Sequence, residues 1–334
     1  MVLSGTGAAP AFRLSLEERR EPGPGPGEIS IAVSACGVCR TDLHIAEGEV
    51  SSALPIVPGH QAAGRVSRVG RGVTAFREGD TVGVGWLWRT CGVCRFCASG
   101  RENLCLAPLH TGRDRDGGYA ETMIADARFA FRLPGGLAPE NAAPLLCAGI
   151  IGYRSLAVSG IRPGGGLGLV GFGASAHLAI QVALHRKCAV YVFTREERHR
   201  RLAREMGAVW AGEVGDDPGV PLEAAITFAP AGELIPAMLP RLDRGGTLAV
   251  NAIHMSPIPS FSFDDLYWER GVRSVASYTR RDAEEFLALA AEIPIRARIE
   301  TFPLDRAADA LVAISRGEIE GAAVLRVRDP SVVG

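Results

Sequence analysis

Lysine is almost absent from this sequence of 334 residues: Lys187 is the single one, and arginine supplies the other permanently cationic side chains. No lysine lies near any group of reactive residues, which argues against a lysine base or a Schiff-base mechanism. The formal net charge is −1 and no block of basic residues occurs, so no nucleic-acid partner is expected.

Long apolar runs are missing as well. We find no stretch of about 18 apolar residues, the minimum for a membrane helix. The first ten residues lack the charged start and apolar run of a secretory signal. We therefore expect no membrane partner and a cytoplasmic protein. With 47% hydrophobic and 22% charged residues, a chain of this length is typical of a globular protein with two domains.

The order of the predicted elements indicates an insertion of one domain into another. Short strands between Gly and Pro turns fill the first part, at 29–34, 64–69 and 81–85. From about Gly149, strands (167–171, 189–194, 224–228, 246–251) alternate with helices (174–185 and from Glu196), which predicts a parallel sheet between helices. A helix over 305–316 and a strand over 322–327 follow. We expect a β-rich domain of residues 1–148 and 290–334, and an α/β domain of residues 149–289.

Four of the eight cysteines lie close together in the sequence, with the spacing of a metal site. They are Cys91, Cys94, Cys97 and Cys105. Clustered cysteines in an intracellular protein are metal ligands more often than disulfides. Four thiolates close a tetrahedron around zinc and leave no position for a substrate, so we expect a structural zinc. A nucleic-acid zinc module is the alternative, but no basic surface accompanies it.

A second set of donors has the composition of an open zinc site. Cys36 and Cys39 lie in one turn, His60 follows a glycine in another, and Cys147 stands alone before the α/β domain. Two cysteines and one histidine are the ligands that a catalytic zinc uses in alcohol dehydrogenases.

The order of these motifs resembles the zinc-dependent alcohol dehydrogenases of the medium-chain dehydrogenase/reductase family. The chain has Cys39-Arg-Thr-Asp-Leu-His44, Gly59-His60, the four-cysteine lobe and a lone Cys147 before the dinucleotide fold. The resemblance covers essentially the whole chain. It implies a Rossmann-type α/β domain with a parallel sheet and a β-rich GroES-like catalytic domain. It also implies an NAD(P)-dependent oxidoreductase acting on a primary or secondary alcohol or an aldehyde, and a homodimer or homotetramer.

Individual roles follow from the resemblance. The catalytic zinc ligands would be Cys39, His60 and Cys147, because the family ligand directly precedes the Arg-Thr-Asp-x-His run. Thr41 would touch the substrate hydroxyl. His44 would receive the proton of that hydroxyl through the cofactor ribose and pass it to solvent. The remaining assignments are Asp42 as the partner that orients His60 and Arg40 on the cofactor pyrophosphate. Gln61 departs from the family's glutamate, and we expect a more electrophilic zinc and altered rates.

The dinucleotide motif is Gly171-Phe-Gly173-Ala174, directly after a predicted strand and at the start of a helix. In that context the helix N-terminus and its backbone N–H groups would hold the pyrophosphate. Further cofactor contacts are expected where later strands of the sheet end. These candidates are Phe228, Asn251 and Ile253.

The residue after the second strand of the α/β domain predicts the cofactor. NAD enzymes place an acid there for the ribose 2′-hydroxyl, whereas this chain has Thr194 followed by Arg195. An arginine is suited to pair with a 2′-phosphate. NADP is therefore favoured over NAD, with two zinc ions per chain as the other cofactors.

Two tryptophans precede the four-cysteine lobe, where the family lines its substrate pocket. We do not expect both to face the same pocket, and we expect Trp86 at the pocket and the other tryptophan, Trp88, in the core. Two other functions remain open. A zinc-free quinone or enoyl reductase of the same fold would not need Cys39, His60 and Cys147, and an inert cofactor-binding relative would not need Thr41 and His44.

Overall fold

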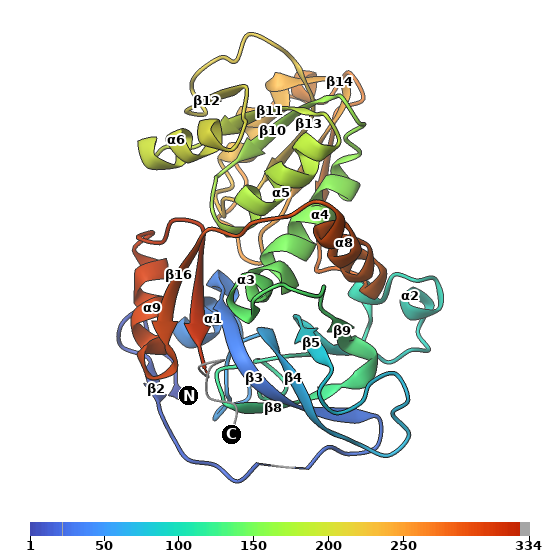
Figure 1. The fold of residues 1–334 in the computed structure, drawn as a ribbon. Helices are drawn as coiled ribbons and strands as arrows, with labels where there is room; N and C mark the ends of the chain where they lie inside the picture. Colours follow the sequence, from blue (N-terminus) through green and yellow to red (C-terminus); the bar gives the residue numbers. More distant parts are fainter. Residues whose placement is uncertain (22, 328–334) are drawn as a thin grey trace. The chain divides into compact units, whose positions relative to one another are not determined.

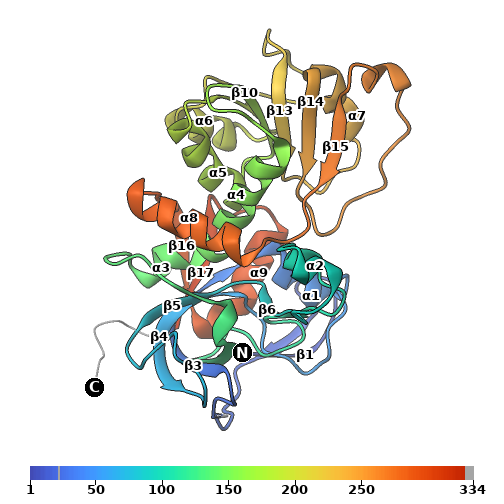
Figure 2. The ribbon, with the colours of Figure 1, turned by 90° about the vertical axis from the view of Figure 1, so that its right-hand side faces the viewer.

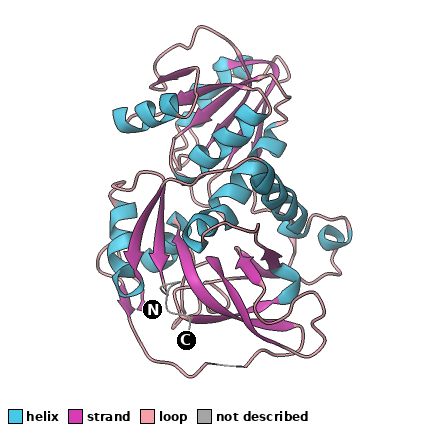
Figure 3. Cartoon of the chain, in the orientation of Figure 1, coloured by secondary structure: helices cyan, strands magenta, loops and turns pink. Residues whose placement is uncertain are grey.

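The computed structural model describes residues 1–21 and 23–327, and the chain forms two compact units (Figures 1 and 3). The first unit comprises Met1–Cys147 and Thr279–Gly334, and the second comprises Ala148–Tyr278. Of the expected β-rich domain, residues 328–334 lie outside the described part of the chain.

The second boundary differs from the expected one near residue 290. It lies directly before α8 (Arg280–Glu292), a helix that the strand-and-helix pattern had assigned to the α/β domain. Thr279 caps this helix, since its hydroxyl accepts from the Asp282 N–H at 3.1 Å. The Arg280 N–H donates to Glu102 at 3.0 Å, and the Arg280 guanidinium lies 5.1 Å from the Phe129 ring. These contacts assign α8 to the first unit.

The first unit is built on a mixed sheet with the strand order β16–β17–β3–β4–β5–β9, and β8 also pairs with β3. Along β3 the side chains of Ile29, Ile31 and Val33 are fully buried, as one face of a strand at period two requires. The bounds are β3 Glu28–Val38, β4 Gln61–Val69, β5 Thr81–Val84, β8 Thr122–Asp126, β9 Ala130–Arg132, β16 Ile299–Pro303 and β17 Ala322–Arg326.

Shorter elements surround this sheet. Helix α1 packs against α9, and β1 pairs with β2 as β6 pairs with β7. The bounds are α1 Arg40–Glu47, α2 Arg95–Ala98, α3 Pro139–Ala142, α9 Ala307–Ser315, β1 Val2–Gly5, β2 Arg13–Ser15, β6 Leu87–Arg89 and β7 Leu109–His110.

The second unit contains the expected parallel sheet, in the order β12–β11–β10–β13–β14–β15. Numbered along the chain, this is 3-2-1-4-5-6, the order of a dinucleotide-binding Rossmann sheet. Figure 1 labels β10 to β14 and Figure 2 labels β15 beside β14. Helices α4 and α5 pack against each other beside it. The bounds are β10 Gly166–Val170, β11 Ala189–Phe193, β12 Trp210–Gly212, β13 Leu222–Thr227, β14 Leu242–Val250, β15 Gly271–Ser274, α4 Ala148–Ser159, α5 Ala174–His185, α6 Glu197–Glu205 and α7 Leu234–Met238.

One helical stretch, Pro139–Ser159, is long and apolar enough to cross a membrane by length and composition alone. The apolar pattern of the sequence did not predict such a run. Of its most apolar window, 67% is buried inside the protein. Burial of this extent is what a core helix of a folded domain shows, because its apolar side chains contact other protein side chains.

Candidate active site and cofactor motif

Three donors from distant parts of the first unit converge. Cys39 is the N-cap of α1, His60 directly precedes β4, and Cys147 follows a short 3-10 helix. Their ligand atoms lie within 4.8 Å of one another. Cys36 is not in this group: its Sγ lies 3.6 Å from the Gly37 carbonyl oxygen, and burial raises the pKa of its thiol strongly.

Asp42 organises the three donors from a fully buried position. Its Oδ1 lies 2.9 Å from His60 Nδ1, and its Oδ2 accepts from the Cys39 N–H at 2.9 Å and the Tyr119 hydroxyl at 3.1 Å. A carboxylate at Nδ1 selects the tautomer with its proton there, so Nε2 keeps the lone pair that a metal needs.

The contacts among the three donors shift their pKa values in different directions, and the hydrogen bond with Cys39, with burial, raises the pKa of Cys147 well above its usual value. Burial lowers the pKa of His60, but the charge and hydrogen bond of Asp42, together with Cys39, raise it to about 10. The hydrogen bond from Cys147 lowers the pKa of Cys39 well below its usual value, against burial, and His60 lowers it further. Both shifts favour the charged forms of Cys39 and His60, and a divalent metal at the Cys39 thiolate and His60 Nε2 would take the place of a proton.

The four cysteines of the lobe also converge. The Sγ–Sγ distances are 3.9 Å for Cys91–Cys97, 3.6 Å for Cys94–Cys97 and 3.5 Å for Cys105–Cys91. Zinc–sulfur bonds of about 2.3 Å in a tetrahedron place sulfurs about 3.8 Å apart. Backbone N–H groups of Cys97 and Leu106 lower the pKa of Cys94 to about 6, so its thiolate is accessible near neutral pH. The lobe fits a zinc ion.

The expected proton path lies on α1. Thr41 is half-buried, and His44 is buried with its Nδ1 against Glu49 Oε2. Arg40, the expected pyrophosphate contact, is exposed, and its guanidinium donates to the Ile314 carbonyl at 2.7 Å, at the end of α9.

The two tryptophans lie in different surroundings. Trp88 is 4% exposed, and its indole N–H donates to the Ile124 carbonyl at 3.3 Å. The Trp86 ring lies 5.0 Å from the ring of His60, nearly perpendicular to it, and 4.7 Å from the ring of His110. Trp86 therefore lies beside His60, and His110 extends this aromatic wall.

Gln61, the departure from the family pattern, is the first residue of β4 and is buried. It pairs with Gly37 across the sheet. A Cβ on Gly37 would come within 2.9 Å of Gln61 Oε1. The glycine therefore provides the space that the buried amide occupies.

The glycine motif of the second unit has the expected geometry. β10 ends at Val170, Gly171 has φ +81°, and α5 begins at Ala174 with Gly173 as its N-cap. A Cβ on Gly171 would touch Ala229 at 3.4 Å, whereas a Cβ on Gly173 would meet nothing within 4 Å. The space beside the start of α5 is therefore open to a ligand, as pyrophosphate binding at a helix N-terminus requires.

Other expected cofactor residues follow strands of the same sheet. Phe228 comes after β13 and Asn251 after β14, and the Asn251 side chain donates to the Ser155 hydroxyl at 3.0 Å. Ile253 is 54% exposed. All three lie beyond the carboxyl ends of the strands, the edge at which open α/β sheets bind ligands.

Thr194 and Arg195 form the turn after β11, where Thr194 is buried and Arg195 is exposed. Arg200 Nη1 holds this turn, donating to the Thr194 carbonyl at 2.9 Å and to the Arg195 carbonyl at 2.8 Å. The same guanidinium contacts Glu197 and Glu213. Arg200 thus stabilises the turn through hydrogen bonds, and the two carboxylates compensate the charge of the Arg200 guanidinium.

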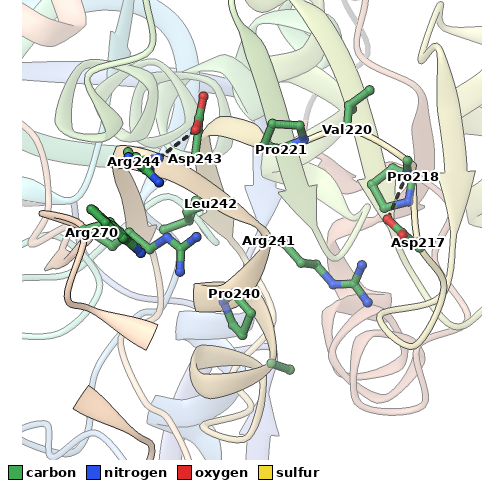
Figure 4. A pocket seen from close by; sticks show the side chains of 13 residues that line it. Asp217, Pro218, Val220, Pro221, Pro240, Arg241, Leu242, Asp243, Arg244 and Arg270 are labelled. Carbon is green, nitrogen blue, oxygen red and sulfur yellow. Dashed lines mark hydrogen bonds between the residues drawn. The ribbon is translucent and has the colours of Figure 1, made fainter. Parts of the chain in front are cut away.

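A pocket of about 820 Å³ lies at the opposite edge of this sheet (Figure 4). Its lining includes Pro221, Leu242 and Arg270, which stand at or before the amino ends of β13, β14 and β15. Because the glycine turn is at the carboxyl ends, this pocket is separate from the dinucleotide motif.

Comparison with known proteins agrees with both units. Residues 25–135 match the model of the alcohol dehydrogenase GroES-like domain. A Mycobacterium tuberculosis (strain CDC 1551 / Oshkosh) protein named as an alcohol dehydrogenase, AdhA, is 49% identical, covering 92% of this chain and 91% of its own. An alcohol dehydrogenase of Geobacillus stearothermophilus is 34% identical, covering 95% and 96%.

Solved structures have the same fold over the full length. A cinnamyl alcohol dehydrogenase from Sorghum bicolor has a TM-score of 0.88 at 28% identity, covering 97% of this chain and 96% of its own. Acetophenone reductase from Geotrichum candidum NBRC 4597, with NAD, has 0.86 at 25%, covering 99% and 98%. A protein from Sinorhizobium meliloti 1021, with NADP, has 0.86 at 25%, covering 98% and 100%.

These findings define a GroES-like domain joined to a Rossmann domain, acting as an NAD(P)-dependent oxidoreductase on alcohols and aldehydes. The chain belongs to the alcohol dehydrogenases of the medium-chain dehydrogenase/reductase family. Sequence reasoning did not single out Tyr119, His110, Glu49 or Arg200. Each of these four residues contacts a predicted site residue in the folded chain. None of them belongs to a motif with a recognisable spacing in the sequence.

Proposed function

We propose that this alcohol dehydrogenase holds two zinc ions per chain, one at Cys39, His60 and Cys147 and one in the four-cysteine lobe. The observation that carries the proposal is the convergence of two sulfurs and an imidazole that a buried carboxylate orients. Zinc at the first site would act as a Lewis acid that lowers the pKa of an alcohol hydroxyl. The lobe, with four thiolates, would hold a structural ion.

The residues around the open site act on the substrate. Asp42 fixes the tautomer and direction of His60. Trp86 offers an apolar wall beside His60 for the carbon chain of a primary or secondary alcohol or aldehyde. Thr41 would take the proton of the substrate hydroxyl, and His44 would carry it outward. NAD(P), held by Gly171, Gly173, Ala174, Phe228, Asn251 and Ile253, supplies the hydride acceptor.

Zinc content tests this assignment. About two zinc ions per chain, with turnover of small alcohols, is the expected result of elemental analysis and a substrate panel. A chain with one zinc or none that reduces quinones or enoyl substrates would instead be a zinc-free reductase. A chain with two zinc ions and no turnover on any alcohol or aldehyde would be an inert relative.

NADP is the proposed cofactor. Thr194 brings no carboxylate to repel a 2′-phosphate, and the exposed Arg195 has a planar guanidinium for it. A charge-assisted hydrogen bond contributes about 1.5–3 kcal/mol, and solvent exposure moves it toward the lower end, about tenfold in affinity. Arg40, which is exposed, remains the proposed contact to the cofactor pyrophosphate.

Michaelis constants for both cofactors test the preference. Thr194→Asp should shift it toward NAD(H), and Arg195→Ala should weaken NADP(H) alone. A parent that strongly prefers NAD, with Arg195→Ala neutral for both cofactors, would contradict it.

We further propose a cytoplasmic homodimer or homotetramer. Strand β15 is the outer strand of the Rossmann sheet, and its Val272 is exposed. Nearby large apolar side chains are exposed too, at Ile258, Phe261, Phe263, Tyr267 and Trp268. An uncovered edge strand beside such a patch favours pairing with a second copy. Light scattering should give two or four chains, and Val272→Arg should reduce that number.

A further inference from the structure

The pocket at the amino ends of β13, β14 and β15 contains a bulge of β14 in its wall. Strand β14 pairs with β13 at Leu242 and again from Thr247, so residues 243–246 bulge out of the regular ladder between these points. Within the bulge Gly245 has φ +74°, a left-handed conformation that glycine adopts without strain. The bulge thereby places Arg244 in the lining of the pocket.

Three arginines line the pocket, and each is held by an uncharged group (Figure 4). The Arg244 guanidinium lies 3.7 Å from the centre of the Trp268 ring. Arg241 and Arg270 each donate one N–H to a backbone carbonyl oxygen, and the Nε–H of each is buried without a hydrogen-bond partner among the described residues. Since a guanidinium has five N–H donors, all three arginines keep donors for a ligand.

The positive charge of these arginines is not compensated by ion pairs. The two lining carboxylates, Asp217 and Asp243, each accept a backbone N–H of their own turn, at 2.9 and 2.8 Å (dashed in Figure 4). In the described part of the chain none of the three guanidiniums is paired with a carboxylate, whereas Arg162 of the same unit pairs with Glu223. Because the guanidiniums outnumber the carboxylates, the pocket has a positive potential that favours an anion.

We propose that this pocket binds a small molecule that carries a phosphate or pyrophosphate group. The planar guanidinium forms paired hydrogen bonds with phosphate oxygens. The volume of about 820 Å³ is within the range of about 300–1,000 Å³ that small-molecule sites have, so the pocket has room for more than a free anion. Because it lies at the amino ends of the strands, its ligand is additional to the dinucleotide, and binding there depends neither on the zinc sites nor on the choice between NAD and NADP.

Arg273 provides a matched control. It is exposed on β15 and is not part of the pocket lining. Arg244→Gln and Arg270→Gln each remove one positive charge from the pocket, and Arg273→Gln removes the same charge outside it. A general effect of net charge on anion binding is therefore common to the three variants, whereas an effect of the site is confined to the first two.

The first test is a calorimetric titration of the full chain, with its dinucleotide bound, with inorganic pyrophosphate. We expect one pyrophosphate per chain, bound about tenfold more weakly in Arg244→Gln and in Arg270→Gln, because each variant loses a charge-assisted hydrogen bond. Arg273→Gln should bind as the parent does. No binding by the parent, or equal affinities in all four proteins, would overturn the proposal. Loss of binding in Arg195→Ala alone would also overturn it, since the pyrophosphate would then lie in the cofactor site.

A parallel titration distinguishes a free anion from a larger ligand. ADP or ribose 5-phosphate should bind more tightly than inorganic pyrophosphate, because the rest of the pocket adds contacts to those of the phosphate. If neither did, the ligand would be a free inorganic anion and the assignment to a small molecule that carries phosphate would be wrong.

The last test uses the parent protein and does not depend on the folding of a variant. Phenylglyoxal modifies exposed guanidiniums, and mass spectrometry gives the rate at each arginine. Bound pyrophosphate should slow the modification of Arg244 severalfold and leave that of Arg273 unchanged. Because Trp268 also belongs to the apolar patch beside β15, the measurement is repeated in Val272→Arg, where the same protection is expected. Equal protection of Arg244 and Arg273, protection of neither, or its loss in Val272→Arg would refute a site within one chain.

Discussion

The two cysteine sites of the first unit are built in opposite ways. The donors of the open site come from three separate elements and are held by Asp42, which is 0% exposed. The lobe site lies within one segment, Cys91 to Cys105, and Cys91 is exposed. In the lobe, backbone N–H groups surround the sulfurs, as where Cys94 N–H points to Cys91 Sγ at 3.4 Å. A buried carboxylate therefore supports the open site, whereas local backbone contacts in an exposed segment support the lobe.

Because of this difference, loss of a ligand should affect mainly activity at the open site and mainly stability in the lobe. Loss of a ligand from the open site leaves Asp42 and its hydrogen bonds in place, so the core persists. Loss of a ligand from the lobe removes the main cross-link of a segment whose helix α2 buries none of its residues. Metal sites of the second kind contribute directly to folding.

The largest effect is expected from Cys147→Ser. A Lewis acid contributes several kcal/mol of transition-state stabilisation, so turnover should fall by roughly 1000-fold or more. Zinc content should fall by one ion per chain while the Tm stays close to that of the parent. Near-normal turnover in a variant without the second ion would contradict the open-site assignment.

Cys94→Ala should lower stability more than turnover, the opposite of Cys147→Ser. The Tm should fall by several degrees and the oligomer should loosen, because the lobe loses a ligand and its metal. Turnover at low temperature should change much less than in Cys147→Ser. If the Tm and the zinc content both matched the parent, the structural role of the lobe would be wrong.

Tyr119→Phe tests the support of the open site. The Tyr119 hydroxyl is fully buried, and burial with the nearby Asp42 charge raises its pKa well above the usual value, so it stays a donor. Its removal leaves Asp42 with one donor fewer, which costs about 1 kcal/mol of unfolding free energy. We expect zinc at the open site to bind about tenfold more weakly, with lobe zinc unchanged. Competition with a chelator measures both; equal weakening of the two sites would contradict the comparison.

The sequence predicted much of this fold, because its period and its motifs are local signals. Apolar runs marked β10 and β11, and the predicted helix 174–185 coincides with α5. It missed α8 as part of the first unit, since that assignment depends on the distant pair Arg280 and Glu102. Short strands such as β15 also escaped notice, because they carry too few apolar residues to form a pattern.

Prediction of the site from the sequence has the same limit: local motifs are recognised, whereas contacts between distant residues are not. Motif order indicated the three donors and the four lobe cysteines, and the structure brings each set together. Contacts that depend on side-chain direction were not predictable: the bond from Arg40 to Ile314 and the hydroxyl of Tyr119 on Asp42 both link residues far apart in the chain. Sequence spacing carries no information about such pairs.

Glu102→Gln should have the smallest effect on the protein. Glu102 supports the lobe as Asp42 supports the open site, so this variant tests the second of the two supporting carboxylates. Glu102 is 6% exposed, and it accepts from the N–H of Arg280 at 3.0 Å and from its Nε at 3.2 Å. Burial opposes ionisation of Glu102, but these bonds hold its pKa below the usual value. A lowered pKa in the folded protein stabilises it above the ordinary value of about 4.3, and this contribution is lost as the pH falls through the folded value.

The variant should therefore lose stability at neutral pH and lose less in acid. Arg280 is 43% exposed, so the effect is reduced to about 1 kcal/mol, or roughly 2 °C in Tm. The control is Glu285→Gln, which breaks the exposed pair with Arg281 on the same helix and should change the Tm by less than this. A Tm difference between Glu102→Gln and the parent that stayed constant from pH 7 to about pH 4 would show that packing, not charge, anchors the lobe to α8.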